Sequence, residues 1–209
     1  MTEEVQVWVA PLDVNDSRYE ELARVLPADE KNRAAALNPV AARRFVVARG
    51  ILRRLLSGFT GTAPERLQFS YGHSGKPVLI DRDDIHFNIS HSAELGLFAF
   101  SPDRPVGVDV ENERPVRRLL DVAQRFMSED ELRTLADTPA SERNSAFLKS
   151  WVVREARLKA EGKGIWNTGG KDASSTTLTH RLFAPRPNYI AAVAAPEKDW
   201  RLFTCAMRD

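Results

Sequence analysis

The sequence predicts an α+β protein built from two halves, and three observations support this. Short stretches of alternating apolar residues, typical of strands, occur in both parts of the chain. Longer runs with apolar residues at three- and four-residue spacing, typical of helices, accompany them in each part. Between the parts lies SPDRP, residues 101–105, whose two prolines favour a linker. We therefore expect a first half of residues 1–103 and a second half of residues 104–209, each with helices and a small sheet.

The first half is expected to open with a strand, because residues 5–10 show the alternating pattern. Helical runs follow, and Asn38-Pro39 separates the last two of them, since the residue before a proline disfavours helical backbone angles. Short strands then complete the half. The expected helices are 17–26, 29–37 and 40–57, and the expected later strands are 67–71, 78–80, 86–89 and 95–100.

The second half is expected to open with the strand VGVDVE at 106–111. Ser128 and Glu131 form a capping-box pattern at the start of one helix. Gly162 and Gly164 are expected to close a long helix, and the polar segment 167–177 is expected to form a loop. The expected helices are 116–126, 129–136 and 141–163, and the expected closing strands are 177–183, 189–194 and 201–206.

Two carboxylates share one face of the strand expected at 106–111. Successive side chains of a strand point to opposite faces, so Asp109 and Glu111 lie on one face and the valines on the other. Neighbouring like charges repel unless a positive charge lies between them. A divalent cation such as Mg²⁺, which prefers oxygen ligands, would remove that repulsion. Taken alone, however, such a pattern is more often the solvated face of an edge strand.

A third carboxylate, Glu155, lies within the apolar stripe of the long helix rather than opposite it. Glu155 follows Trp151 by four residues and Val152 by three. A carboxylate in such a position is costly unless it is paired or binds a metal. An ion pair with Lys159, one turn further along, is the simpler interpretation of the helix by itself.

Four motifs together resemble those of a known family. GKP (75–77), FNISHS (87–92), VGVDVE (106–111) and WVVREARLKAEGKG (151–164) occur in the order and at the spacing seen in 4′-phosphopantetheinyl transferases. The resemblance is to the larger, single-chain class, which activates carrier proteins of peptide and polyketide synthetases. Each motif is modest alone, but four in register are a specific match. The resemblance covers most of the chain and implies two α+β halves packed pseudo-symmetrically, with the active site in the cleft between them.

The resemblance also implies which residues form the site. It makes Asp109, Glu111 and Glu155 the ligands of Mg²⁺, with Mn²⁺ as the alternative metal. The implied catalytic residues are Asp109, Glu155 and Lys159, with Glu155 as the base for an incoming serine and Lys159 placed to stabilise the departing phosphate. The residues implied to bind coenzyme A, the substrate, are Lys31, Arg44, Lys76, Ser90, His91, Arg154 and Lys159.

The chain departs from the family's pattern at two positions. Arg154 stands where a lysine usually precedes the helix glutamate, and Ala34 stands where a second phosphate-contacting lysine is frequent. Arginine keeps the positive charge but has a different reach and donor geometry. Ala34 lowers the positive charge expected at that edge of the site.

Several of these assignments have plainer interpretations from the residues alone. The run RRFVVARGILRR (43–54) carries five arginines, which fit a solvated helix face, and all but Arg44 are assigned to the surface. Lys76 fits a turn. His91 fits a structural hydrogen-bonding role, and Ser90 lacks the GxSxG elbow of a serine nucleophile.

The resemblance implies transfer of the 4′-phosphopantetheine arm of coenzyme A to a serine of an acyl or peptidyl carrier protein, with release of adenosine 3′,5′-bisphosphate. Two alternatives remain open. One is a Mg²⁺-dependent nucleotide hydrolase using the same carboxylates, and the other is a non-catalytic module that binds carrier proteins or coenzyme A. Because one chain carries all four motifs, the site is expected to form within a monomer.

Composition sets the remaining expectations. The 209 residues carry a formal net charge of +1 at pH 7, which argues against a general nucleic-acid-binding protein. Cys205 is the single cysteine, so no internal disulfide can form, as is usual in a reducing cytosol. The first residues lack the basic start and apolar run of a signal peptide, and no stretch has the ~20 apolar residues of a membrane helix. We therefore expect a cytoplasmic protein with no nucleic-acid or membrane partner.

Overall fold

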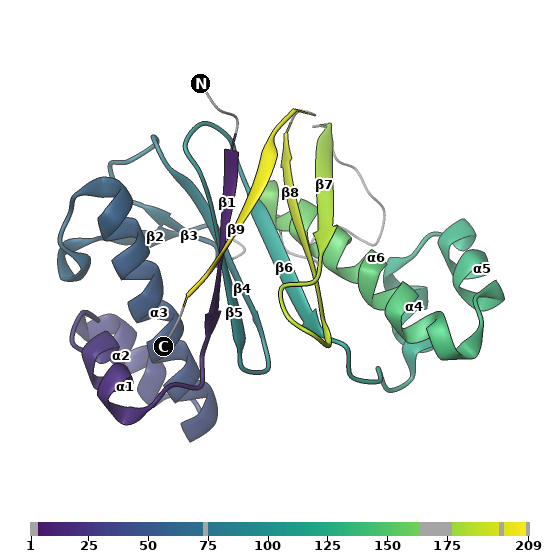
Figure 1. Cartoon of the computed structure of the whole chain (residues 1–209), viewed down its shortest axis with the longest axis horizontal. Helices are drawn as coiled ribbons and strands as arrows, with labels where there is room; N and C mark the ends of the chain where they lie inside the picture. Colours follow the sequence, from purple (N-terminus) through teal and green to yellow (C-terminus); the bar gives the residue numbers. More distant parts are fainter. Residues whose placement is uncertain (1–3, 73–74, 164–176, 197–198, 208–209) are drawn as a thin grey trace.

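The computed structural model describes residues 4–72, 75–163, 177–196 and 199–207 (Figure 1). Its helices and strands follow the predicted order. They are β1 (Glu4–Pro11), α1 (Asp16–Ala23), α2 (Ala28–Ala35), α3 (Pro39–Thr60), a 3₁₀ turn (Pro64–Arg66), β2 (Phe69–Tyr71), β3 (Pro77–Leu79), β4 (His86–Ser92), β5 (Leu95–Ser101), β6 (Gly107–Asn112), α4 (Leu119–Phe126), α5 (Glu129–Asp137), α6 (Ala140–Ala160), β7 (Leu178–Phe183), β8 (Tyr189–Pro196) and β9 (Arg201–Ala206).

Local signals in the sequence explain where several helices begin and end. The Asn38 side chain accepts a hydrogen bond from the Ala41 N–H at 3.0 Å and so caps α3, whose first residue is a proline. The predicted capping box of Ser128 and Glu131 is present at the start of α5. α6 stops at Ala160, and Gly162 adopts the left-handed conformation (φ 71°) that ends many helices. Gly164 and residues 167–176 of the expected loop lie outside the described residues.

The strands form two main sheets and one hairpin. One sheet has the order β4-β5-β1-β9, the other has the order β6-β8-β7, and β2 pairs with β3. Neighbouring strands are antiparallel except for β1 and β9, which run parallel. β9 therefore comes from the expected second half but completes the sheet of the first half. The boundary between residues 103 and 104 stays a prediction. The pairing of β9 with β1 means that the two expected halves share one sheet.

The two sheets lie between two groups of helices, as Figure 1 shows. One face of the first sheet packs on α3, beside which α1 and α2 lie. Its other face packs on the second sheet through a core of valines and alanines from β1, β6 and β8. The far face of the second sheet packs on α6. Each valine or leucine fully buried in these cores contributes roughly 1.5–3 kcal/mol.

The edge strands β4 and β6 of the two sheets are joined by side chains of β4. Asn88 Oδ1 accepts a hydrogen bond from the Val108 N–H at 2.9 Å, and Ser92 Oγ accepts one from the Asn112 N–H at 3.1 Å. Edge strands otherwise leave such backbone groups unpaired. Residues 88, 90 and 92 share one face of β4, so Ser90 also points at β6. We call this contact of Asn88, Ser90 and Ser92 with β6 the seam.

β6 also lies very close to α6, and Gly107 makes that approach possible. A Cβ atom built on Gly107 would lie 2.0 Å from the Ala156 carbonyl oxygen and 2.3 Å from the Ala160 nitrogen. Both are backbone atoms of the helix, so no side-chain rotation could relieve the clash. The glycine of VGVDVE thus sets the distance between the strand that carries Asp109 and the helix that carries Glu155.

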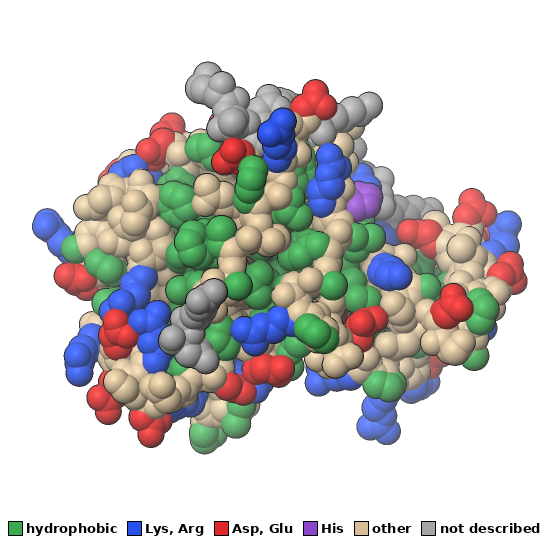
Figure 2. All heavy atoms as spheres, in the orientation of Figure 1, with side chains coloured by type: hydrophobic (Ala, Val, Ile, Leu, Met, Phe, Trp, Pro, Cys, Tyr) green, Lys and Arg blue, Asp and Glu red, His purple; other side chains and the backbone are tan. Residues whose placement is uncertain are grey.

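The outer surface mixes charges of both signs. On the face in Figure 2, Lys and Arg side chains are interspersed with Asp and Glu. This mixture agrees with the small net charge of the whole chain. Within the part of the chain that the structure describes, no helix is both long enough and apolar enough to cross a membrane.

Candidate functional site

The predicted carboxylate strand has the expected alternation, but its surroundings differ from a solvated edge. Val108 and Val110 fill the core between the sheets, while Asp109 and Glu111 point to the opposite side. Asp109 is only 5% exposed. The interpretation of an outward, solvated strand face is therefore wrong for Asp109, because the seam and α6 enclose its carboxylate.

Asp109 is held by a three-member network. Its Oδ1 accepts hydrogen bonds from Ser90 Oγ at 2.8 Å and from Lys159 Nζ at 2.7 Å. Lys159 Nζ also lies 3.1 Å from Ser90 Oγ, to which it donates. The network joins β4, β6 and α6, and its ion pair has little contact with solvent on the Asp109 side. Lys159 thus pairs across elements with Asp109, whereas the helix pattern by itself suggested Glu155 as its partner.

Glu111 and Glu155 complete the predicted carboxylate set. Ser92 Oγ donates to Glu111 Oε2 at 2.9 Å, so the seam orients this carboxylate as well. Burial raises the pKa of Glu111, and the negative charge of Asp109 adds to the effect. Burial likewise raises the pKa of Glu155, and the nearby charges of Asp109 and Glu111 raise it further while Lys159 opposes them. The three carboxylates therefore act on one another electrostatically.

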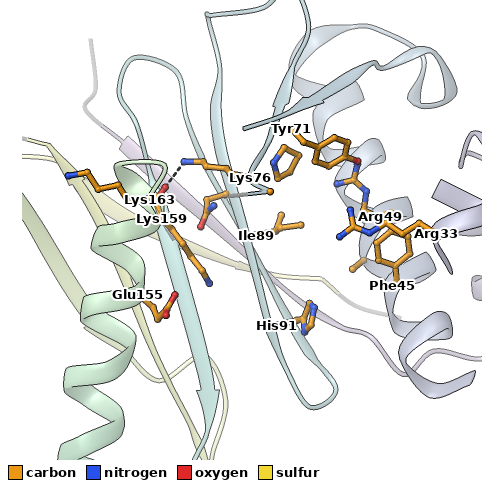
Figure 3. Close-up of a pocket in the computed structure, with 14 residues that line it drawn as sticks. Arg33, Phe45, Arg49, Tyr71, Lys76, Ile89, His91, Glu155, Lys159 and Lys163 are labelled. Atoms are coloured by element: carbon orange, nitrogen blue, oxygen red, sulfur yellow. Dashed lines mark hydrogen bonds between the residues drawn. The ribbon is translucent and has the colours of Figure 1, made fainter. Parts of the chain in front are cut away.

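A cavity of about 320 Å³ opens beside this network and is lined by residues from both halves of the chain. Figure 3 shows Glu155 and Lys159 of α6 on one side and Arg33, Phe45, Arg49 and Tyr71 on the other. The lining residues are Arg33, Phe45, Ala48, Arg49, Tyr71, Gly75, Lys76, Pro77, Asn88, Ile89, His91, Glu155, Lys159 and Lys163.

The cavity wall is strongly cationic. Its lining includes five Lys and Arg side chains but only one carboxylate, that of Glu155. At the end farthest from α6, the Arg33 guanidinium lies over the rings of Phe45 and Tyr71, 5.3 and 5.9 Å from their centroids. Such a wall favours a ligand that carries several negative charges.

The prediction that Arg49 and Arg53 lie on the surface is wrong. Their exposed fractions are 4% and 2%, and both pair with Glu30 of α2, which is 2% exposed. Arg53 also donates to the carbonyl oxygens of Pro64 and Leu67. Both arginines lie in the apolar face of α3, at i and i+4, and that position within the stripe was the signal for burial. The buried pairing holds Arg49 at the cavity wall.

Lys76 lies in the cavity wall but its ammonium is already bonded. Its Nζ donates to the carbonyl oxygens of Val106 at 3.0 Å and Lys159 at 2.8 Å. Burial, together with the charge of Lys159, lowers the pKa of Lys76 to about 8. The interpretation as a simple turn lysine is therefore incomplete, because the side chain connects the two halves.

Ser90 and His91, expected to act together on phosphates, point to different places. Ser90 belongs to the network with Asp109, and His91, on the opposite face of β4, lines the cavity. Desolvation lowers the pKa of His91, and the positive charge of Lys159 lowers it further. A neutral imidazole at the cavity wall can still donate one hydrogen bond.

The remaining predicted cofactor residues do not line the cavity. Lys31 is exposed on α2. Arg44 makes a two-pronged ion pair with Asp13, with both N–O distances 2.8 Å, and this raises the pKa of Arg44. Arg154 is half-buried on α6, and its charge, like that of Lys159, opposes the rise that burial causes in the pKa of Glu155. The roles of Lys31, Arg44 and Arg154 stay predictions. Among the cavity residues that sequence reasoning missed are Arg33, Phe45, Arg49, Tyr71 and Lys163.

The chemistry of the carboxylates fits a hard divalent cation. Asp109 Oδ2 is buried and has no hydrogen-bond partner among the described residues, which leaves an oxygen available to a cation. Within the described ranges, however, no three His, Cys, Asp or Glu side chains already converge as a ready metal site. Lys159 supplies the positive charge at Asp109 in this structure.

Comparison with known proteins identifies relatives of this chain. A family model described as the 4′-phosphopantetheinyl transferase superfamily matches residues 105–187, which include Asp109, Glu111, Glu155 and Lys159. The chain is 39% identical to the 4′-phosphopantetheinyl transferase HetI of Nostoc sp. (strain PCC 7120), over 96% of this chain and 91% of that protein.

Two Bacillus proteins are similar to shorter parts of the chain. The chain is 32% identical to the 4′-phosphopantetheinyl transferase psf-1 of Bacillus pumilus, over 76% of this chain and 68% of that protein. It is 33% identical to Sfp of Bacillus subtilis (strain 168), also a 4′-phosphopantetheinyl transferase, over 59% of this chain and 54% of that protein. On the strength of its similarity to HetI along nearly its whole length, the chain belongs to the 4′-phosphopantetheinyl transferase family of enzymes.

Proposed function

We propose that the protein transfers the 4′-phosphopantetheine arm of coenzyme A to a serine of an acyl or peptidyl carrier protein. The other product is adenosine 3′,5′-bisphosphate. The observation that carries the proposal is the cationic cavity, which reaches from Arg33 and Arg49 to Lys159, the ion-pair partner of the buried Asp109. Membership of the family supports the same reaction.

The charge of the cavity suits coenzyme A. This substrate carries a 3′-phosphate and a pyrophosphate, and hydrogen bonds to such anions from Lys or Arg are stronger than neutral ones. We assign the nucleotide to the end formed by Arg33, Phe45 and Tyr71, where flat aromatic and guanidinium groups are available for stacking. The pyrophosphate is then assigned to the end near Lys159 and His91.

The proposed chemistry takes place beside α6. A bond forms between the carrier serine oxygen and the phosphorus that bears the pantetheine arm. The bond from that phosphorus to the bridging pyrophosphate oxygen breaks, and its electron pair leaves with adenosine 3′,5′-bisphosphate. Glu155 is the proposed acceptor of the serine proton, directly or through a water that it orients. Lys159, one turn further along α6, is proposed to stabilise the charge that grows on the leaving phosphate.

Asp109, Glu111 and Glu155 are the proposed ligands of Mg²⁺, with Mn²⁺ as the alternative. The partnerless Asp109 Oδ2 and the mutual repulsion of the three carboxylates support this assignment. A bound cation would neutralise pyrophosphate charge as the bond breaks. The residues themselves contribute orientation, because Ser90 and Ser92 of the seam hold Asp109 and Glu111 through hydrogen bonds.

The carrier protein is proposed to approach from the side of Glu111. There a second cavity, of about 470 Å³, has apolar walls from Phe147, Trp151 and neighbouring residues. Arg114 and Arg117 also line it. An apolar groove with arginines suits an amphipathic helix with acidic residues, and its position beside Glu111 would bring the carrier serine to the carboxylates.

We further propose that a monomer is the active form. Both expected halves, residues 1–103 and 104–209, contribute side chains to the same cavity. The parallel pairing of β9 with β1 ties the end of the second half to the first. A single chain therefore supplies each group that the proposed reaction uses.

Product analysis tests the proposal. The protein is incubated with coenzyme A and Mg²⁺ in three parallel reactions. The first contains a carrier protein, the second contains the same carrier with its serine replaced by alanine, and the third contains no carrier. Release of adenosine 3′,5′-bisphosphate only with the serine-containing carrier supports transfer. Release without any carrier would show a nucleotide hydrolase, and coenzyme A binding without any release would show a non-catalytic module.

A further inference from the structure

Lys76 connects the β2–β3 hairpin of the first half to two elements of the second half. Its Nζ bonds the carbonyl oxygen of Val106, 30 residues along the chain, and that of Lys159, 83 residues along. Figure 3 shows the Lys76 side chain extended toward the end of α6. Such a contact brings together segments that no local interaction would hold.

The backbone at Lys76 is fixed by a tight turn. The Gly72 N–H donates to the Lys76 carbonyl oxygen at 3.1 Å, and the Gly75 N–H donates to the Gly72 carbonyl oxygen at 2.8 Å. Gly75 has φ 75°, a left-handed conformation that glycine adopts without strain. The lysine side chain therefore extends from a constrained base.

Both acceptors of Lys76 lie where they matter for the site. The Lys159 carbonyl belongs to the last turn of α6, where it also accepts a hydrogen bond from the Gly162 N–H at 3.2 Å and where a cation is favoured by the helix dipole. The Val106 carbonyl immediately precedes β6, at the point where Gly107 touches α6. The Lys76 ammonium thus forms hydrogen bonds both to the start of the strand that carries Asp109 and to the end of the helix that carries Lys159.

We infer that Lys76 is a positioning residue, which fixes the relative placement of β6 and α6 and thereby the Asp109–Lys159 pair. An ammonium has three N–H donors, and two of those of Lys76 are already used on backbone carbonyls. Its main role is therefore to hold the protein together rather than to bind phosphate. The effect on turnover rests on the proposed function, whereas the effect on the backbone does not.

Amide hydrogen exchange without coenzyme A tests the inference. Lys76→Met keeps side-chain length but removes the donors and the charge. We expect exchange to become about tenfold faster both at Gly107–Val108 and in the last turn of α6. The matched control is Lys163→Met, which removes another lysine from the same cavity, one whose ammonium pairs with Glu161 at 2.9 Å. Lys163→Met should leave exchange at Gly107–Val108 unchanged.

Steady-state kinetics supply a second readout. If Lys76 positions the Asp109–Lys159 pair, Lys76→Met should lower kcat more than it raises KM for coenzyme A. The reason is that this pair acts on the charge that develops in the transition state. Lys76→Arg, which keeps donors and charge, should retain exchange protection at both segments. If Lys76→Met does not fold, Lys76→Gln, which keeps an N–H donor without charge, replaces it.

Two results would overturn the inference. One is unchanged exchange at both remote segments in Lys76→Met. The other is a variant whose defect is confined to a raised KM for coenzyme A, which would make Lys76 an anion ligand. If the wild-type protein proved inactive, the proposed function would fail while the exchange measurements would still decide the role of Lys76.

Discussion

At the scale of the residue, we expect the ion pair of Asp109 and Lys159 to contribute both to the stability of the fold and to the rate of the proposed transfer. The exposed fractions of the two side chains are 7% and 27%. Lys159→Met leaves a buried carboxylate without its cation, so we expect the free energy of unfolding to fall by about 3 kcal/mol, the lower end for broken buried pairs. Carrier modification should slow on the order of 100-fold. Urea unfolding and modification rates measure the two effects separately.

A double-mutant cycle with Asp109→Asn is the control for that pair. The double variant leaves neither charge buried, so it should regain part of the lost stability while activity stays low. Simply additive losses of unfolding free energy would contradict a direct interaction between the two side chains.

The lowered pKa of Lys76 predicts a specific pH dependence. Its pKa is about 8 in the folded protein against an ordinary value of 10.5, so the unfolded chain binds the proton more tightly. Burial causes most of this lowering of the pKa and the positive charge of Lys159 adds to it, whereas His86 nearby, whose own pKa is lowered chiefly by burial and then by Lys76, is neutral in this pH range. Stability contributed by Lys76 therefore rises with pH between about 8 and 10.5.

Comparison of the wild type with Lys76→Met isolates that contribution. From pH 7.5 to pH 9.5, the difference in unfolding free energy should shift in favour of the wild type by on the order of 1–2 kcal/mol. Urea titrations at both pH values give this difference. A constant difference would mean that the lysine titrates normally in the folded state.

Sequence patterns predicted the direction of side chains better than their burial. The alternation in VGVDVE placed Asp109 and Glu111 on one face, and the structure agrees. The burial of Asp109 could not be read from that alternation, because Ser90 and Lys159, which enclose it, lie 19 and 50 residues away. Arg49 was assigned to the surface for a similar reason, since its partner Glu30 lies on another helix.

At the scale of elements, the close packing of β6 against α6 requires a glycine at position 107. Gly107→Ala places a methyl group against helix backbone, so we expect a loss of about 3 kcal/mol of stability, the upper part of the overpacking range. Gly58→Ala is the matched control, because a Cβ there meets nothing within 4 Å. In helix α3 it should raise stability by about 0.5–1 kcal/mol. Thermal or urea unfolding of both variants checks the contrast, and an equally small effect at Gly107 would contradict the close packing.

The positions of helices and strands along the chain could be predicted from the sequence, whereas the pairing of the strands within and between the sheets could not. Caps and glycines gave the ends of α5 and α6 to within a few residues. Nothing local in residues 201–206 indicated parallel pairing with β1, because pairing of the two ends of a chain depends on the whole fold. The seam was hidden for the same reason, since Asn88 and Ser92 satisfy backbone groups of a strand twenty residues away.

At the scale of the whole molecule, a ligand that binds a cavity built from both halves should stabilise the entire fold. Coenzyme A at about 100 times its Kd should add about 2.7 kcal/mol to the unfolding free energy. Adenosine, which lacks the phosphates, should add far less at the same concentration because the cavity is cationic. Thermal unfolding followed with each ligand measures this, and equal stabilisation by both would contradict recognition of the phosphates.

The oligomeric state belongs to the same scale. Light scattering should give the mass of one chain with and without coenzyme A, and activity per chain should not change on dilution. An obligate trimer whose activity disappears on dilution would contradict a site built within one chain. The resemblance of four motifs supported this expectation from the sequence, but the cationic wall of Arg33 and Arg49 emerged only from the fold.

Intact mass of a carrier protein tests the central claim most directly. After incubation with this protein, coenzyme A and Mg²⁺, the carrier should gain one phosphopantetheine on its serine. The gain should be absent when the serine is alanine and strongly reduced with Asp109→Asn, whose carboxylate the network of Ser90 and Lys159 holds. No gain with the wild type, or an equal gain with Asp109→Asn, would contradict the account.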